Sequence, residues 1–371
     1  MDSKQPKARV LAYYLPQFHP IPENNEWWGE GFTEWTNVGK AKQLFPGHYQ
    51  PRVPADLGYY DLRVPETRKA QADMAREYGV EGFVYWYYWF GNGKRLLERP
   101  FNEVLESGQP DFPFALAWAN ETWSGFAHGL NEERPPLIMQ TYSGDEDYIA
   151  NFNTVLPAFK DKRYVTCDGK PIFIIYKADQ LPDVKHFIEL WQKMAKMNGL
   201  EGVYFIAHEM GLYDDHTIQK RIEIRQEMGF DAINIVNIKI HSTLQMPWWN
   251  RLLRKLFYKN PKWRILPNIL PYDVSVFKTS YDCLDYVIPS VLPGWDHTPR
   301  TGIRGDVLYG ATPKLFGKAV EYAVNVVQNK SYEKRFIFIK SWNEWAEGNY
   351  MEPDLKYGRG YLEALRENLF N

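Results

Sequence analysis

Short β-favouring runs alternate with stretches of helical periodicity along almost the whole chain, and this alternation limits the possible folds more than any other feature of the sequence. The eight predicted strands cover residues 9–15, 82–89, 112–119, 171–176, 203–207, 232–236, 286–291 and 335–341. The predicted helices cover residues 66–78, 96–106, 148–159, 184–197, 218–227, 313–327 and 361–369. Strict alternation predicts a parallel sheet with right-handed crossovers, and eight repeats predict that this sheet closes. The expected fold class is therefore α/β, as a single (β/α)8 TIM-type barrel.

Two long loops account for the length of the chain beyond a typical barrel. The sequence has 371 residues, whereas such barrels have about 250. The excess falls after the first predicted strand, at 17–64, and after the sixth, at 237–285. No Pro/Gly/Ser-rich linker or low-complexity tract divides the chain, which predicts one domain over residues 1–371. Loops that follow barrel strands gather at one face, so both long loops are expected to wall the functional site.

Composition argues against several classes of function. The formal net charge of −2 provides no field that would attract nucleic acid. Cys167 and Cys283 stand far apart in no Cys-x-x-Cys pattern, and the 8 histidines show no metal-ligand spacing. No Gly-x-Gly-x-x-Gly follows the first predicted strand, which counts against a dinucleotide-binding fold. Nothing in the sequence therefore points to a disulfide framework, a metal or a cofactor.

Two features of the sequence concern membranes. The first eight residues lack an apolar core and no stretch approaches eighteen apolar residues, so the chain as given is expected to be cytoplasmic unless a leader has been removed. Residues 247–259 are basic and amphipathic. They fit a helix that docks on an anionic membrane surface, or the sixth barrel helix packed on the sheet. The barrel helix is the favoured interpretation.

The clearest indication of chemistry is a pair of acids just after the last predicted strand. Glu344 and Glu347 lie three residues apart beside Trp342 and Trp345. Active sites of α/β barrels form where strands end, and cleavage of a glycosidic bond needs one carboxyl to donate a proton while another stays ionised. The alternative is that both acids are only solvated loop residues or the first turn of a helix. The interleaved indoles favour a functional role, with both carboxylates exposed.

Tryptophans and polar side chains are expected at the same strand ends. Ten of the 14 tryptophans fall there: Trp27, Trp28, Trp35, Trp86, Trp89, Trp118, Trp123, Trp295, Trp342 and Trp345. An aromatic surface edged by donors and acceptors suits a pyranose ring. Packing beneath loops is the alternative, and we expect it for about half of them. Polar residues at these ends could likewise serve only as helix caps.

Five segments together resemble one protein family. They are residues 12–19 (AYYLPQFH), 28–35 (WGEGFTEW), 118–121 (WANE), 293–296 (PGWD) and 343–348 (NEWAEG). These segments span nearly the whole chain and resemble the WbsX family, which is similar to glycoside hydrolase family 99. WbsX proteins are associated with bacterial surface-polysaccharide gene clusters and are often labelled glycosyltransferases. The resemblance implies a (β/α)8 barrel that acts on a polysaccharide without a metal.

The resemblance also implies roles for the two acids. Family 99 enzymes carry a Glu-Trp-His-Glu motif, and this chain has Ala346 in place of the histidine. Glu344 is then expected to act as base on the substrate 2-hydroxyl, which attacks its own anomeric carbon, while Glu347 serves as acid and base with a raised pKa. The expected substrate-binding residues are Tyr13, Tyr14, Trp35, Trp86, Trp118, Asn120, Glu121, His208, Glu209, Asn237, Trp295, Asp296, Arg300, Asn343 and Trp345.

Three functions stay open at this point. The leading one is a retaining, endo-acting glycoside hydrolase on a bacterial or dietary polysaccharide. Within it, Glu344 could instead be a nucleophile with Glu121 as the acid. The second is a glycosyltransferase or transglycosylase of surface-polysaccharide assembly, although the chain shows neither an Asp-x-Asp metal motif nor a Rossmann-like order. The third is a carbohydrate-binding barrel without catalysis.

Overall fold

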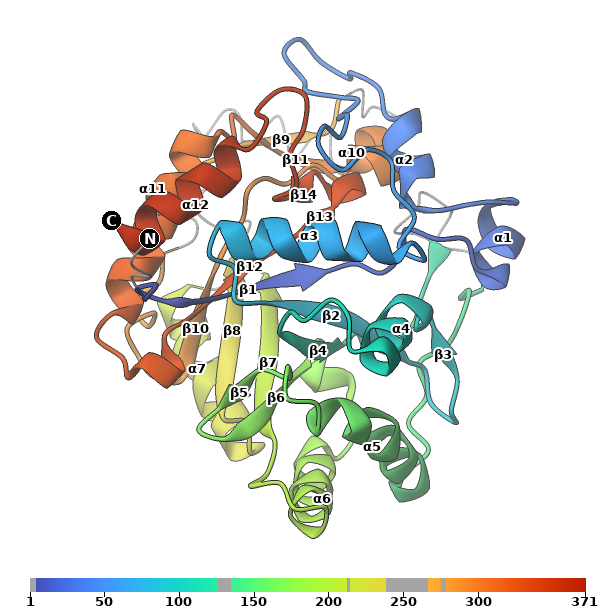
Figure 1. Ribbon diagram of the computed structural model, residues 1–371, viewed down its shortest axis with the longest axis vertical. Helices are drawn as coiled ribbons and strands as arrows, with labels where there is room; N and C mark the ends of the chain where they lie inside the picture. Colours follow the sequence, from blue (N-terminus) through green and yellow to red (C-terminus); the bar gives the residue numbers. More distant parts are fainter. Residues whose placement is uncertain (1–4, 126–134, 212–213, 238–265, 275–277) are drawn as a thin grey trace.

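Eight parallel strands form a closed barrel in the computed structural model, which describes residues 5–125, 135–211, 214–237, 266–274 and 278–371 (Figure 1). In order around the barrel they are β1 (Arg9–Tyr14), β2 (Gly82–Trp89), β4 (Phe114–Trp118), β6 (Lys170–Ile175), β7 (Tyr204–Gly211), β8 (Ala232–Asn237), β10 (Val287–Val291) and β12 (Phe336–Ile339). The last strand pairs with the first, with Val10 opposite Ile337, and this pairing closes the sheet. The predicted (β/α)8 TIM-type fold is confirmed.

Helices cover the outside of the barrel (Figure 1). They are α3 (Pro65–Glu77), α4 (Arg99–Ser107), α5 (Asp145–Phe159), α6 (Val184–Met197), α7 (Asp215–Glu227), α11 (Pro313–Val327) and α12 (Gly360–Phe370). Each matches a helix expected from the sequence. The basic segment 247–259 lies outside the described residues. Within the described ranges, no helix is both long and apolar enough to cross a membrane.

Shorter elements decorate the strand ends. The loop after β1 holds α1 (Pro22–Trp28) and α2 (Glu34–Lys40), and the chain after β10 holds α10 (Thr298–Thr301). The remaining short elements are β3 (Arg95–Leu96), β5 (Thr166–Cys167), β9 (Asn268–Pro271), β11 (Asp306–Tyr309), β13 (Asn343–Glu344), β14 (Asn349–Tyr350), η2 (Ala178–Gln180), η5 (Gly302–Arg304), η6 (Tyr332–Lys334) and η7 (Trp345–Glu347). The last strand, β12, ends at Ile339, two residues before the predicted end at residue 341, and the β13–β14 hairpin and η7 follow it.

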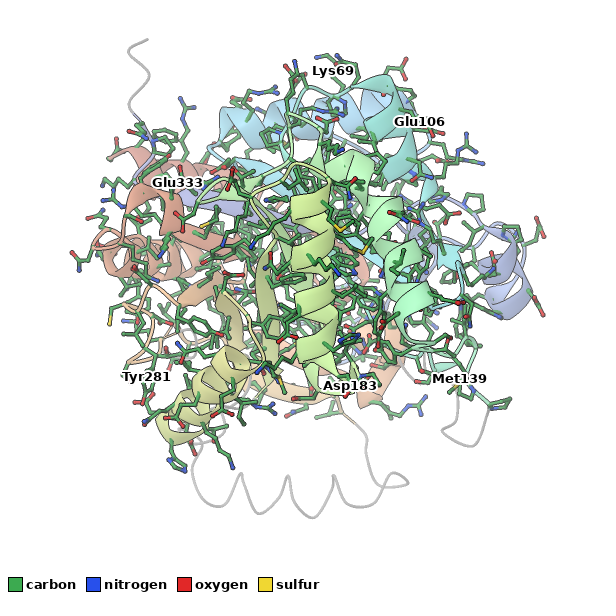
Figure 2. All side chains as sticks on the ribbon, turned by 90° about the horizontal axis from the view of Figure 1, so that it is seen from below. Lys69, Glu106, Met139, Asp183, Tyr281 and Glu333 are labelled. Carbon is green, nitrogen blue, oxygen red and sulfur yellow. The ribbon has the colours of Figure 1, made fainter. Side chains whose placement is uncertain are left out.

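Alternation along each strand separates the barrel interior from the layer beneath the helices. Tyr13 points inward, where its ring stacks on Trp86 at a centroid distance of 4.8 Å. Its neighbour Tyr14 points outward and contacts Phe83 and Tyr85 at 4.9 and 4.5 Å. The helix layer contains large buried side chains such as Phe187 and Trp191 of α6, whose N-terminal end lies at Asp183 (Figure 2). The alternation of side chains along each strand therefore decides which aromatic residues can reach the centre of the barrel.

Candidate active site

A cavity of about 260 Å³ opens at the carboxyl ends of the barrel strands. Its lining residues lie on β2 or follow β1, β4, β6, β10 and β12. They are Leu15, Gln17, Asn24, Trp28, Trp86, Tyr88, Ala119, Glu121, Thr122, Trp123, Ser124, Leu137, Tyr176, Arg300, Lys340, Glu344 and Glu347. The cavity thus combines aromatic walls with several ionisable groups, as a site that orients a polar ligand requires.

Glu344 lies at the base of this cavity. Backbone pairing with Asn349 in the β13–β14 hairpin holds it in place, and its residue surface is only 5% exposed. The indole Nε1–H of Trp86 donates a hydrogen bond to its Oε1 at 2.9 Å. Burial, together with the nearby Glu347, raises the pKa of Glu344 to about 7, against the opposing charges of Lys340 and Arg300. The expectation of an exposed carboxylate here is wrong, because the hairpin turns Glu344 into the barrel.

Glu347 lies beside charged side chains, whereas Glu344 lies beside an indole. The Arg300 guanidinium donates to its Oε1 at 2.5 Å, and His297 Nε2 lies 4.0 Å from the same oxygen. The nearby Glu347 carboxyl contributes to the raised pKa of Glu344, after burial. The structure raises the pKa of Glu344, a shift that the sequence-based expectation, which concerned Glu347, did not include.

Arg300 links this pair to the loop after β1. On its other side the guanidinium contacts both oxygens of Glu34, with Nη2 to Oε1 at 3.2 Å and Nε to Oε2 at 3.3 Å. Glu34 is fully buried in the first turn of α2, where a capping box at Thr33 fixes the start of the helix. One partly buried cation therefore joins two carboxylates from distant loops, and its position depends on both.

A polar layer lies beneath the cavity floor. The Tyr13 hydroxyl donates to Asn234 Oδ1 at 2.9 Å and lies 3.0 Å from His208 Nδ1. Burial and the charge of Lys340 hold the pKa of His208 well below its usual value, so its imidazole is neutral. Tyr13 and His208 therefore support the floor formed by Trp86 and Tyr176, instead of lining the cavity directly.

Glu121 forms the far wall. Lys177 Nζ lies 4.0 Å from its Oε2, and burial raises the pKa of Glu121 against the opposing charges of Lys177 and Lys340. Asn120 holds this corner together, because its amide donates to the Lys177 carbonyl and accepts from the Lys177 backbone N–H at 2.7 Å. Asn120 therefore ties the ends of β4 and β6 and does not line the cavity.

Several expected substrate-binding residues lie elsewhere in the structure. Trp118 packs outward against Phe187 of α6, and Tyr14 hydrogen-bonds Gln71 of α3. Trp35 donates its indole N–H to the Tyr60 carbonyl beneath the loop after β1. These side chains face the helix or loop layers because they sit on the outward positions of their strands, or under the loop.

The last strand and its hairpin also contain residues that hold the fold. Asn343 bonds the backbone N–H and carbonyl of Leu15 at 2.7 and 3.0 Å. Trp345 is 1% exposed and stacks on Tyr350 at 3.8 Å. Trp342 is also buried, packed on Phe83. The expected ring of tryptophans is therefore only partly present at the cavity, where its members are Trp28, Trp86 and Trp123.

The remaining expected residues are placed outside the cavity lining. Glu209 pairs with Arg225 of α7 at 2.5 Å. Asp296 accepts hydrogen bonds from His48 and Gln50, both at 2.8 Å, and so anchors the loop after β1. Trp295 lies buried, and its ring is parallel to that of His297. Asn237, at the end of β8, is also buried.

Among the lining or supporting residues that sequence reasoning missed are Glu34, Tyr88, Tyr176 and Lys340. Two of them carried a signal. Glu34 is an acid within an otherwise aromatic segment, and Lys340 is a cation at the end of an apolar strand. The described residues contain no group of three or more His, Cys, Asp or Glu side chains that could hold a metal ion.

Comparison with known sequences extends over nearly the whole chain. The family model described as "Glycosyltransferase WbsX" matches residues 10–365. Two relatives named "Uncharacterized protein WxcX", from Xanthomonas campestris pv. campestris strains B100 and ATCC 33913, are each 35% identical over 364 residues. That match covers 98% of this chain and 50% of the relative, so the chain spans about half the length of these relatives.

Solved structures with the same fold are more distant in sequence. A "Glycoside hydrolase-like protein" aligns with a TM-score of 0.60 at 16% identity, over 100% of this chain and 96% of its own. A GH99 endo-alpha-mannosidase from Bacteroides thetaiotaomicron, in complex with bis-tris-propane, aligns with a TM-score of 0.59 at 13% identity, covering 98% and 96% of the two chains. At these identities the likeness establishes a shared fold.

Proposed function

The chain belongs to the WbsX family, and from that premise we propose that it is a retaining, endo-acting glycoside hydrolase whose cavity binds a polysaccharide. The observation that carries this proposal is that Glu344 and Glu347 line the same aromatic cavity, where Trp86 donates to Glu344 and Arg300 donates to Glu347. Acid and base catalysis at a glycosidic bond requires one carboxyl that donates a proton and one that accepts a proton, and Glu344 and Glu347 supply these two groups.

The first chemical step uses both carboxyls. Glu344 takes the proton of the substrate 2-hydroxyl, and O2 attacks the anomeric carbon. The bond from that carbon to the leaving sugar breaks, and Glu347 delivers a proton to the leaving oxygen. This step requires Glu344 to be ionised and Glu347 to be protonated when it begins. A base with a pKa near 7 is well matched to reaction near neutral pH.

The second step returns the protein to its starting state. Water attacks the anomeric carbon and opens the three-membered ring, Glu347 accepts the proton from water, and Glu344 returns a proton to O2. Two displacements at one carbon retain its configuration. Trp28, Trp86 and Trp123 supply flat apolar surfaces against which sugar rings can lie.

The description of the family model as a glycosyltransferase supports a second candidate function. The same two carboxyls can transfer the sugar if the hydroxyl of another glycan takes the place of water. Product analysis separates the two functions, because hydrolysis generates a new reducing end whereas transfer lengthens an acceptor chain.

A panel of bacterial surface polysaccharides and mannans, analysed by mass spectrometry of the products, tests the proposal. Glu344→Gln and Glu347→Gln are each expected to lower kcat by about 100-fold or more, because each removes a proton-transfer group. Glu352→Gln is the matched control: Glu352 is equally buried, with its pKa also raised to about 7 by burial, but lies outside the cavity lining. Full activity in either cavity variant would refute its role.

A 2-fluoro sugar with an activated leaving group tests the mechanism. It lacks the 2-hydroxyl that the proposed first step needs, so no covalent adduct should accumulate. A stoichiometric mass increase mapped to Glu344 would identify Glu344 as a nucleophile, with Glu121 across the cavity as the acid.

A further inference from the structure

Lys340 is a buried cation that faces the cavity. It follows β12 directly and is 4% exposed. Its ammonium lies 3.9 Å from Oε2 of Glu344, the carboxylate oxygen that Trp86 does not contact. The same ammonium sits over the rings of Trp86 and Tyr13, at 5.1 and 5.8 Å from their centroids. Glu344 is thus held between an indole N–H on one oxygen and a cation near the other.

The environment of Lys340 differs from that of Lys330, another buried lysine ten residues earlier in the chain. Lys330 donates to the Val287 carbonyl at 2.5 Å, at the opposite end of the barrel from the cavity, and has no carboxylate within ion-pair distance among the described residues. It therefore satisfies a backbone acceptor and packs the fold. Lys340 instead places its charge between two aromatic faces and beside the base of the proposed reaction, a position that costs desolvation and needs a compensating role.

Other charged and titratable groups surround Glu344 from every side. They are Glu347 on η7, Arg300 on α10, Glu34 on α2, Tyr13 on β1, Tyr88 on β2, Glu121 after β4, Tyr176 after β6 and His208 on β7. Arg300 is shared between Glu34 and Glu347. The tyrosines and His208 are neutral, because burial moves the pKa of each away from the charged form. Lys340 is consequently the cation positioned to offset the negative charge of the Glu344 carboxylate.

We propose that Lys340 is a positioning residue that holds Glu344 in the ionised form and in the orientation that proton abstraction requires. The catalytic part of this inference, that Lys340 supports proton abstraction, rests on the proposed function. The electrostatic part, that Lys340 favours the ionised form of Glu344, rests on the geometry alone. An ammonium about 4 Å from a carboxylate in a poorly solvated site favours the ionised form strongly. Lys340 also lines the cavity, where its ammonium can donate to a sugar oxygen.

Selective ¹³C labelling of glutamate side chains tests the electrostatic part without any substrate. The Glu344 carboxyl signal is assigned by its loss in Glu344→Gln and then titrated in the folded protein. We expect a midpoint near 7 in the wild type and a midpoint higher by about one to three pH units in Lys340→Met. Lys340→Gln, which keeps an N–H donor but no charge, should shift the midpoint as Met does, and Lys340→Arg should leave it nearly unchanged. Lys177→Met is the matched control, since that lysine faces Glu121 at 4.0 Å.

Kinetics tests the catalytic part. The pH profile of kcat/KM is measured for Lys340→Met on a substrate that the wild type cleaves. The pH at which kcat/KM falls on the acid side should be higher than in the wild type, by the same number of pH units as the midpoint of the Glu344 carboxyl. An unmoved midpoint in the folded Met and Gln variants would overturn the proposal, as would an acid limb that stays in place while the midpoint moves. If no glycan is cleaved, the proposed function fails, yet a shifted midpoint still supports the assignment of Lys340 to Glu344.

Discussion

Glu344 and Glu347 show how neighbouring residues of one type acquire different chemistry. They are three positions apart, yet one carboxyl is surrounded by rings and the other touches a guanidinium. The difference comes from their partners: Trp86 lies 258 positions away along the chain, and Arg300 lies 47 away. Sequence alone identified both acids, whereas the assignment of the raised pKa required the three-dimensional contacts.

The pH dependence of activity follows from this difference. Glu344 must be ionised to accept a proton, and burial raises its pKa to about 7. Below that pH the base is increasingly protonated, so kcat/KM should fall about tenfold for each unit of pH. The measurement is a pH profile of kcat/KM for the wild type. A profile that stays flat down to pH 5 would contradict the assignment of Glu344 as the base.

Glu34 offers a second test at the scale of one residue. Glu34→Gln removes one of the two carboxylates that position Arg300, so the guanidinium and with it Glu347 should shift. Because a displacement of about 1 Å at a reacting group can cost about 100-fold, we expect kcat to fall by about one to two orders of magnitude. Glu30→Gln, an exposed acid in the same loop, is the control and should be near wild type. Equal activities in the two variants would show that Glu34 does not position Arg300.

At the scale of the element, strand alternation separates aromatic residues that the sequence places alike. Trp86 and Trp118 lie near the ends of adjacent strands, but Trp86 points into the barrel and donates to Glu344, whereas Trp118 points into the helix layer and donates to the Trp89 carbonyl. Trp86→Phe should therefore lower kcat with little change in stability, and Trp118→Phe should cost about 1–3 kcal/mol of stability with little change in kcat. Thermal denaturation and steady-state kinetics of both variants decide between these outcomes, and a reversed pattern would contradict the strand orientation.

The strands themselves could be predicted because buried parallel strands are continuous apolar runs, and their order followed from the alternation with helices. The sequence did not predict whether each side chain points into the barrel or toward the helices. In a strand buried on both sides, both alternating faces are apolar, so the sequence does not distinguish Tyr13 from Tyr14 or Trp86 from Trp118. The short elements in the loop after β1 were also missed, since seven-residue helices carry little periodicity.

At the scale of the whole molecule, the buried acids should make stability depend on pH. The pKa values of Glu344 and Glu352 are each raised from 4.5 to about 7 by burial. Between those values the folded state holds protons that the unfolded state has lost, so the free energy of unfolding should fall as the pH rises from about 5 to 8, and level off above.

Glu344→Gln tests this dependence, because its amide resembles the protonated carboxyl. The variant should be more stable than the wild type by roughly 1–3 kcal/mol at pH 8, and the gain should shrink toward pH 5. Denaturant unfolding at the two pH values measures the difference, with Glu106→Gln on the surface of α4 as the control (Figure 2). If the gain in stability of Glu344→Gln over the wild type were smaller at pH 8 than at pH 5, the proposed link between the pKa of Glu344 and stability would be contradicted.

The closing of the barrel also brings the two ends of the described chain together. The backbone N–H of Lys7 donates to the Leu369 carbonyl at 3.0 Å, beside the start of β1 and the end of α12 (Figure 1). Strands begin at the end of the barrel opposite the cavity, so a tag, a tether or a surface anchor attached at either end would leave the substrate entrance clear. A short peptide could join the two ends, and new ends could then be opened in a surface loop. The protein is therefore suited to circular permutation and to immobilisation with its active face outward.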